Sequence, residues 1–148
     1  IYMLDNVSIM MEDKLVALSG LKKERYESNV EVFGEKHAAY FDEMLGIVAE
    51  SEDKEAAAAA IAECFVTQVF DAYSKNGKVK SRLQMDLNYM MIYYFFPVML
   101  LKEDENRTLI CDAVRDKWNE VFRTTINYAD YETIKSGFKR KIFGFIIE

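Results

Sequence analysis

The residues best suited to bind a ligand form an aromatic and methionine cluster in the second half of the chain. A tyrosine offers an apolar ring with a polar tip and a methionine adapts its shape, so such a cluster suits a pocket for a flat or apolar molecule, or an adaptable groove for a protein. Plain core packing is the interpretation that these residue types favour. The members are Met85, Tyr89, Met90, Met91, Tyr93, Tyr94 and Trp118. Among them, Tyr89, Tyr93 and Trp118 are the candidates for ligand binding.

His37 is the only histidine in the sequence, and it is the fourth candidate for ligand binding. It lies between Phe33 and Tyr40 on the apolar seam of a helix, where a core or interface histidine is favoured over a catalytic base or a switch. A zinc site needs ligands that the sequence does not cluster, and the Glu-x-x-His motif of di-iron bundles is missing. The sequence therefore predicts no metal and no cofactor.

No arrangement of residues indicates an enzyme. Carboxylate pairs such as Asp112 and Asp116 lie among lysines and arginines, which is typical of a solvated helix face. The composition is compatible with a Ser-His-Asp or a Cys-His-Asn triad, but no nucleophile has a recognisable local setting. Glycine-rich phosphate loops are absent, because the one Asn-Gly pair, at Asn76, is better read as a helix stop.

These candidates must be positioned by helices, and the stretch from Tyr89 to Leu101 is the one around which the others pack. Its sequence, YMMIYYFFPVMLL, carries no charge and cannot face water on any side. At helical rise it covers about 20 Å, which is short of the roughly 30 Å of a membrane core. A buried central helix is therefore predicted rather than a membrane span. Ser81 and Gln84 fit a capping box at its start, and Pro97 predicts a bend or a break.

Apolar residues at helical spacing predict the remaining helices. Ser51 is the expected N-cap of the helix that contains the alanine run at 56–60, where small side chains let a neighbouring backbone approach closely. Asn76 and Gly77 tolerate left-handed angles and are expected to end that helix. Residues 124–129 suit a loop. The expected helices cover 7–18, 21–50, 52–75, 108–124 and a last segment from Asp130.

The fold class expected from this pattern is all-α. No stretch alternates with a period of two, so a sheet is not expected. We predict a single helical domain over residues 1–148, a compact bundle of five to six helices around a central apolar helix at about 81–101, bent or broken near Pro97.

Charge and cysteine usage restrict the class of protein. Residues 1–70 carry fourteen acidic and six basic side chains, a balance of −8, whereas residues 71–148 carry eleven acidic and thirteen basic ones, a balance of +2. The net charge of −6 argues against a nucleic-acid partner. Cys64 and Cys111 are expected to be buried free thiols. Because no basic segment precedes the apolar residues at the start, we expect a cytoplasmic location.

The C-terminal segment from Asp130 is expected to be ordered only by docking. Two glycines weaken its helix, so apolar side chains must supply the energy, against the acidic first half of the same chain or of a second copy. The basic run at 139–141 is then a solvated face beside the docked helix. The interface candidates are Phe138, Ile142 and Phe145.

Three segments together resemble a known group of proteins. YYFFPVMLL, LICDAVRDKWNEVF and YADYETIKSGFKRKIFGFIIE are similar to the C-terminal half of small uncharacterised all-helical proteins of Gram-positive anaerobic bacteria. The resemblance is limited to the C-terminal part of the chain. It implies a helical fold and brings no activity and no functional residues.

Two functions are therefore expected from the sequence. The first is a non-enzymatic interaction protein that forms a homodimer or binds another protein, because apolar residues exceed what one small core requires. The alternative is a helical domain that binds an apolar or aromatic small molecule beside Tyr89, Tyr93 and Trp118.

Overall fold

The computed structural model describes residues 38–128, and within that range Ala38 and Tyr93 are described by their backbone alone. The expected helix at 7–18, the first part of the helix at 21–50 and the segment from Asp130 lie outside the described residues. One of the ligand-site candidates, His37, also lies outside the described residues. The same holds for the three interface candidates, Phe138, Ile142 and Phe145.

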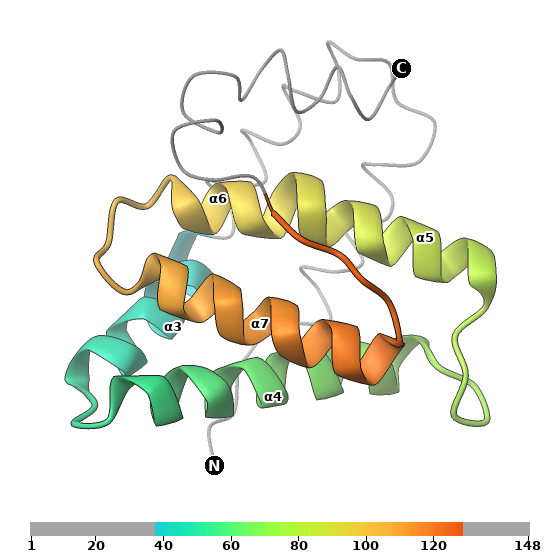
Figure 1. Ribbon diagram of the computed structural model, residues 1–148, viewed down its shortest axis with the longest axis horizontal. Coiled ribbons are helices and arrows are strands. Elements are labelled where there is room, and N and C mark those ends of the chain that lie inside the picture. The colour runs from blue at the N-terminus through green and yellow to red at the C-terminus, as the bar shows by residue number, and fades with distance from the viewer. Residues whose placement is uncertain (1–37, 129–148) are drawn as a thin grey trace, which may run out of the picture.

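The described residues form an all-α structure, as predicted. The elements are α3 (Ala38–Glu50), α4 (Lys54–Tyr73), α5 (Ser81–Met90), the π-helix η1 (Met91–Phe95), α6 (Phe96–Leu100) and α7 (Arg107–Phe122). Helices α4 and α7 lie side by side and run in the same direction, and the run from α5 to α6 returns above them (Figure 1). Residues 38–128 contain no strand, and the one β-bridge joins Lys75 to Lys78 in a turn.

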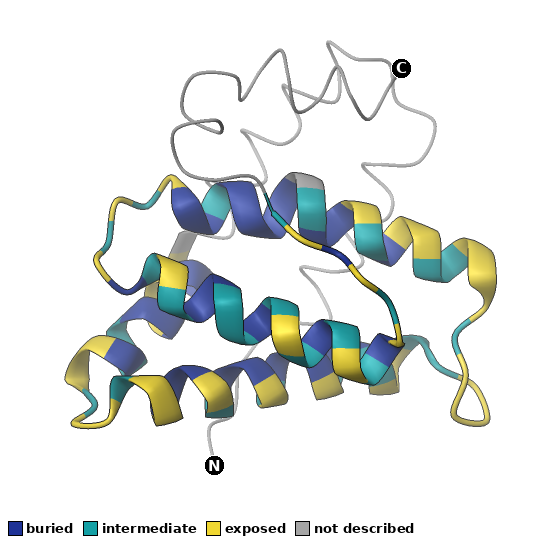
Figure 2. Cartoon of the chain, in the orientation of Figure 1, coloured by how far each residue is buried: buried dark blue, intermediate teal, exposed yellow. Residues whose placement is uncertain are grey.

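The core is built on aromatic rings from four elements. Phe65 of α4 stacks on Phe95 of η1 with 4.9 Å between ring centroids, and Phe41 of α3 contacts the same Phe95 at 5.4 Å. On α7, Trp118 stacks on Phe122 at 4.1 Å. Offset and edge contacts of this kind add stability to the apolar area that they bury. Figure 2 shows the buried positions of α4 along the side of that helix that faces α7.

Helices α4 and α7 form the most extensive contact between elements, and the alanine run explains how. Ala57, Ala58 and Ala62 are buried, whereas Ala56 and Ala59 are exposed. The buried side of α4 therefore carries small methyl groups at these positions, and the close approach of a neighbouring backbone stays a prediction. The expected helix at 52–75 is found with its bounds shifted by two residues at each end.

The start of α4 differs from the prediction. Ser51 is not the N-cap, because its hydroxyl donates to the carbonyl of Ile47, 2.8 Å away, at the end of α3. Asp53 is the cap, and its carboxylate accepts from the backbone amide of Ala56 at 3.1 Å. Only three residues separate α3 from α4, so the serine satisfies one helix end and the aspartate the other.

The predicted capping box at the start of the central helix is wrong. Lys80 is the N-cap position and makes no side-chain cap bond. Ser81 is already the first helical residue, and Gln84 donates from its side chain to Oδ1 of Asn88 at 2.8 Å instead of reaching back. Asn88, one turn further along the same helix, is therefore the partner of the Gln84 side chain, in place of the backbone of the cap residue.

The break near Pro97 takes the form of a π-helical turn. Met91–Phe95 is π-helical, and the amide of Phe96 donates to the carbonyl of Met91, five residues earlier. Pro97 then lies in the first turn of α6, where a missing amide is best tolerated. The central helix expected at about 81–101, bent or broken near Pro97, is therefore divided into α5, η1 and α6, and π-turns of this kind are a known way to interrupt an α-helix.

The turn after α4 confirms the left-handed angles expected of Asn76 and Gly77, with φ of 55° and 74°. The helix itself ends earlier, at Tyr73, and the turn is closed by two backbone bonds between Lys75 and Lys78, of 2.8 Å and 3.1 Å. This tight hairpin carries the chain from the end of α4 to the start of α5.

The alanine contact gives a test of the fold. Replacing the fully buried Ala58 by leucine inserts three carbons into the core beside α4, and we expect a loss of about 1 to 3 kcal/mol in the free energy of unfolding. The matched control is Ala56→Leu, an exposed position in the same run, which should stay within about 0.5 kcal/mol of the parent chain. Urea unfolding followed by circular dichroism measures both. Equal effects at the two positions would contradict the close contact.

Candidate functional site

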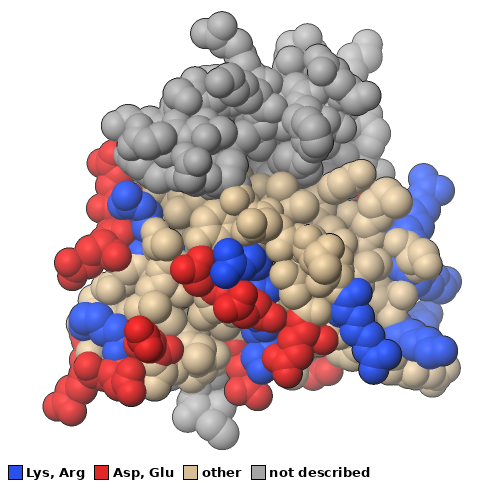
Figure 3. Space-filling model, viewed as in Figure 1, with Lys and Arg blue, Asp and Glu red and all other residues tan. Residues whose placement is uncertain are grey.

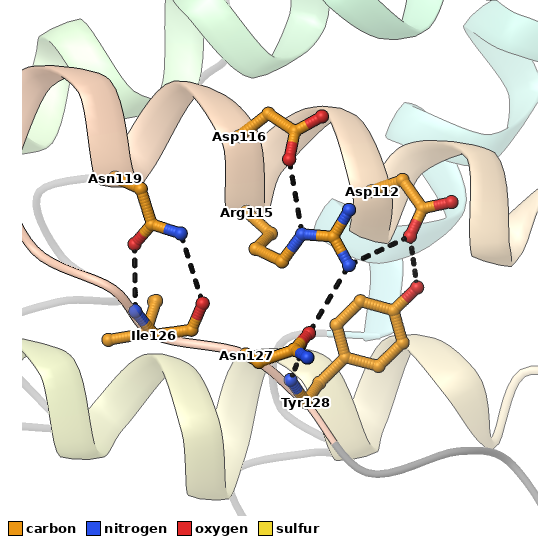
Figure 4. Close-up of polar contacts among 7 residues, drawn as sticks. All are labelled: Asp112, Arg115, Asp116, Asn119, Ile126, Asn127 and Tyr128. Carbon is orange, nitrogen blue, oxygen red and sulfur yellow. Dashed lines mark hydrogen bonds and ion pairs between the residues drawn. The ribbon is translucent and has the colours of Figure 1, made fainter.

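The densest group of polar contacts in the described part holds residues 123–128, here called the return segment, against α7. The chain leaves α7 through Arg123, which has a left-handed φ of 54°, and runs back toward α6 (Figure 1). Polar side chains at positions 112, 115, 116 and 119 of α7 share one helical face. Figure 4 shows this face meeting the return segment.

Asn119 fixes the middle of the return segment. Its amide group donates to the carbonyl of Ile126 at 3.0 Å, and its carbonyl accepts from the backbone amide of Ile126 at 2.8 Å (Figure 4). These two bonds resemble those that a neighbouring β-strand would make. They satisfy both backbone polar groups of Ile126, which is buried. The side chain of Ile126 can therefore enter the core without leaving backbone polar groups unpaired.

Arg115 connects the end of the return segment to α7. Its guanidinium donates to Asp116 at 3.1 Å and to Asn127 at 3.2 Å, and lies 3.5 Å from Asp112. The hydroxyl of Tyr128 donates to Asp112, and the Tyr128 ring lies 5.0 Å from that of Phe96 in α6. Burial, followed by the hydrogen bond to Asp112, raises the pKa of Tyr128. The tyrosine therefore stays protonated at neutral pH and acts as a donor.

Asn88 is a second polar centre, between α5 and α7. Its Oδ1 accepts from Nε1 of Trp118 at 3.0 Å and from the side chain of Gln84, and its Nδ2 donates to the hydroxyl of Thr124 at 3.2 Å. The fully buried indole thus has its one polar atom satisfied. These bonds tie α5, α7 and the return segment together.

The ligand-site candidates from the sequence do not share a surface in the described part. Trp118 is fully buried, whereas 42% of Tyr89 is exposed. The side chain of Tyr93 and all of His37 lie outside what the structure describes. Among the surface depressions lined by described residues, one lies between α4 and α7 and one beside the turn at 75–78, and neither of these is lined by Tyr89 or Trp118. Binding of a ligand by these residues stays a prediction.

The deepest titratable groups of the described core are not suited to catalysis. Burial raises the pKa of the Tyr40 hydroxyl and of the Cys111 thiol, so both are protonated at neutral pH, and a thiol needs its thiolate form to act as a nucleophile. Cys111 is a buried free thiol, as predicted, whereas Cys64 is only half-buried. Among residues 38–128, no group of histidine, cysteine and carboxylate side chains is arranged to hold a metal ion.

The polar contacts of Asn88, Asn119 and Tyr128 were not anticipated from the sequence. The available signal was an asparagine within each of two amphipathic helices, because asparagine is a poor helix former and its side chain seeks local partners. The predicted solvated face at Asp112 and Asp116 is half right. Asp116 is exposed and paired with Arg115, but Asp112 accepts from Tyr128.

Comparison with known proteins adds no functional assignment. No family model, curated protein or solved structure matches the chain. In residues 38–128, no helix has both the length and the apolar character needed to cross a membrane. The resemblance to helical proteins of Gram-positive anaerobes stays a prediction.

Removing Asn119 tests how strongly the return segment is held. Asn119→Ala leaves the amide and carbonyl of a buried Ile126 without partners, and we expect the free energy of unfolding to fall by about 1 to 3 kcal/mol. The control is Thr125→Ala, an exposed position on the same segment, with an expected change within about 0.5 kcal/mol. Hydrogen exchange at the amide of Ile126 should accelerate in the first variant alone. Unchanged exchange there would contradict the role of Asn119.

Proposed function

We propose that this chain is a cytoplasmic, non-enzymatic interaction protein that associates with a second copy through the outer face of α5. The supporting observation is the position of the exposed apolar side chains. The large apolar residues exposed in the described part are Met85 at 54%, Tyr89 at 42% and Leu101 at 37%. Met85 and Tyr89 are four residues apart on one helix, so they share a face.

The α5 face, defined by Met85 and Tyr89, has the chemistry of a contact surface. Methionine adapts to the shape of a partner, and tyrosine is enriched at interfaces because it combines apolar area with a polar tip. By helical spacing, the half-buried Ile92 of η1 continues the apolar stripe formed by Met85 and Tyr89. Exposed apolar side chains of this kind can form the centre of an interface, and the surrounding polar residues then form its rim.

The alternative function, binding of an apolar or aromatic small molecule, has less support from the described residues. Trp118 is enclosed in the core, and its indole N–H is bonded to Asn88. A side chain in that position stabilises the fold and is not available to a ligand without local opening. A co-purified organic molecule in a native mass spectrum would favour this alternative.

Charged substitutions on the α5 face test the proposal. Met85→Glu with Tyr89→Glu removes two apolar side chains from the contact, each worth about 1.5 kcal/mol or more when buried, so we expect dimer affinity to fall by at least about tenfold. Light scattering across a concentration series measures the mass. The control is Thr67→Glu, an exposed position in the middle of α4, which should leave the dimer intact.

The same experiment has two results that would contradict the proposal. One is a parent chain that remains monomeric at every concentration. The other is an equal loss of dimer for Thr67→Glu, because this would show that a new charge at any exposed position has the same effect.

A further inference from the structure

The described part of the molecule is electrically polarised from end to end. One end, here called the basic end, consists of the hairpin after α4, the start of α5 and the last residue after α7. Its five exposed cations are Lys75, Lys78, Lys80, Arg82 and Arg123. Between residues 71 and 86 and between 121 and 124, only Asp71 and Asp86 oppose them. Figure 3 shows the blue side chains gathered at this end.

The opposite end, here called the acidic end, consists of the turn between α3 and α4 and the loop between α6 and α7. Its carboxylates are Glu50, Glu52, Asp53, Glu55, Glu103, Asp104 and Glu105. Lys54, Lys102 and Arg107 lie among them. Lys54 donates to the carbonyl of Ala49 at 3.0 Å, and Lys102 pairs with Asp42 of α3 at 3.0 Å. The red side chains in Figure 3 are concentrated at this end and along the middle of the visible face.

The two ends do not neutralise each other within one copy. Helix α4 has 20 residues and joins the ends, which at helical rise is about 30 Å. That distance is several times the Debye length of about 8 Å at physiological salt. Among the described residues, none of the basic-end cations forms an ion pair: the pairs found are those of Lys102, Arg115 and Lys117. The basic end therefore keeps its charge available for a partner.

We propose that the basic end is a docking surface for the acidic end of a second copy, so that the two copies lie antiparallel. This inference rests on the proposed self-association, whose α5 face lies between the two ends: α5 begins at the basic end, and α6 leads into the acidic loop. Two copies joined along this face can run parallel or antiparallel. The antiparallel arrangement brings opposite charges together twice, whereas the parallel one brings like charges together twice.

A second copy fits this surface better than a polyanion does. The whole chain carries −6, which opposes the approach of a nucleic acid. The acidic end of another copy carries the complementary charge, and a two-fold axis perpendicular to α5 satisfies both contacts and closes the assembly at two copies. The apolar α5 face supplies affinity, and the charged ends select the orientation.

Cross-linking between marked ends tests the orientation. In a chain with Cys64→Ala and Cys111→Ala, one batch carries Asn76→Cys at the hairpin and a second, isotope-labelled batch carries Glu105→Cys at the acidic loop. After mixing, a short thiol cross-linker should join the two kinds of chain. Each batch alone should give little cross-linked product, and homotypic cross-links at the hairpin would overturn the antiparallel arrangement.

Charge reversal gives a second, independent measurement. Lys78→Glu with Lys80→Glu makes the basic end slightly acidic, so that both ends are acidic, and Glu52→Lys with Glu105→Lys cancels the net charge of the acidic end. Each variant alone should dimerise about fivefold to tenfold more weakly than the parent chain, and an equimolar mixture should recover part of the lost affinity, because it restores one of the two contacts between opposite charges. Glu63→Lys, an exposed reversal in the middle of α4, should have little effect.

The failures of the two proposals are distinguishable. A parent chain that stays monomeric in light scattering overturns self-association and, with it, the orientation. A dimer in which neither charge reversal weakens affinity overturns the orientation alone. Mass that keeps growing beyond two copies also overturns it, because that result shows an open head-to-tail contact. The orientation is also overturned if the basic end binds a DNA oligonucleotide and the variant with Lys78→Glu and Lys80→Glu dimerises as strongly as the parent chain.

Discussion

Enclosure of a helical segment that is apolar on every side is the constraint on which the described structure depends. From Tyr94 to Leu100, every residue except the half-buried Val98 is buried. One neighbouring helix can cover only one stripe of such a segment, so partners must approach from several directions. Helix α3 supplies Phe41, α4 supplies Phe65, and the return segment brings Tyr128 onto Phe96. The bundle is the arrangement that removes η1 and α6 from water.

Polar side chains supply hydrogen bonds to the backbone and indole groups that this enclosure removes from water. An irregular segment laid over a core exposes its own amides and carbonyls to an apolar environment, and each unpaired group is costly. Asn119 satisfies both backbone groups of Ile126, and Asn88 satisfies the indole of Trp118 while reaching Thr124. The dense polar contacts therefore maintain the fold of residues 38–128.

Within residues 38–128, the sequence predicted the helices well and the polar contacts poorly, for a physical reason. Helix positions follow from apolar spacing and from local signals such as the left-handed pair Asn76 and Gly77, which short stretches of sequence contain. A hydrogen bond between Asn88 and Trp118 joins residues 30 positions apart, and no local pattern encodes it. The wrong caps have a different reason. Ser51 and Gln84 have the chemistry of caps, but each bonds a residue four positions away, Ile47 and Asn88, and the local pattern does not decide between these partners and the cap.

The π-helical turn connects the buried and the exposed parts of the central run. Each residue of an α-helix advances by about 100°, and a turn closed by a bond to the fifth residue back contains one extra residue, so the side chains after η1 are rotated relative to those before it. Before η1, α5 is buried on the side of Leu87 and Met90 and leaves Met85 and Tyr89 exposed. After η1, Phe96, Pro97, Met99 and Leu100 are all buried. One continuous run thereby has an enclosed core segment at one end and exposed apolar side chains at the other, and Pro97 favours the change of register because it removes the amide that a regular α-helix would use there.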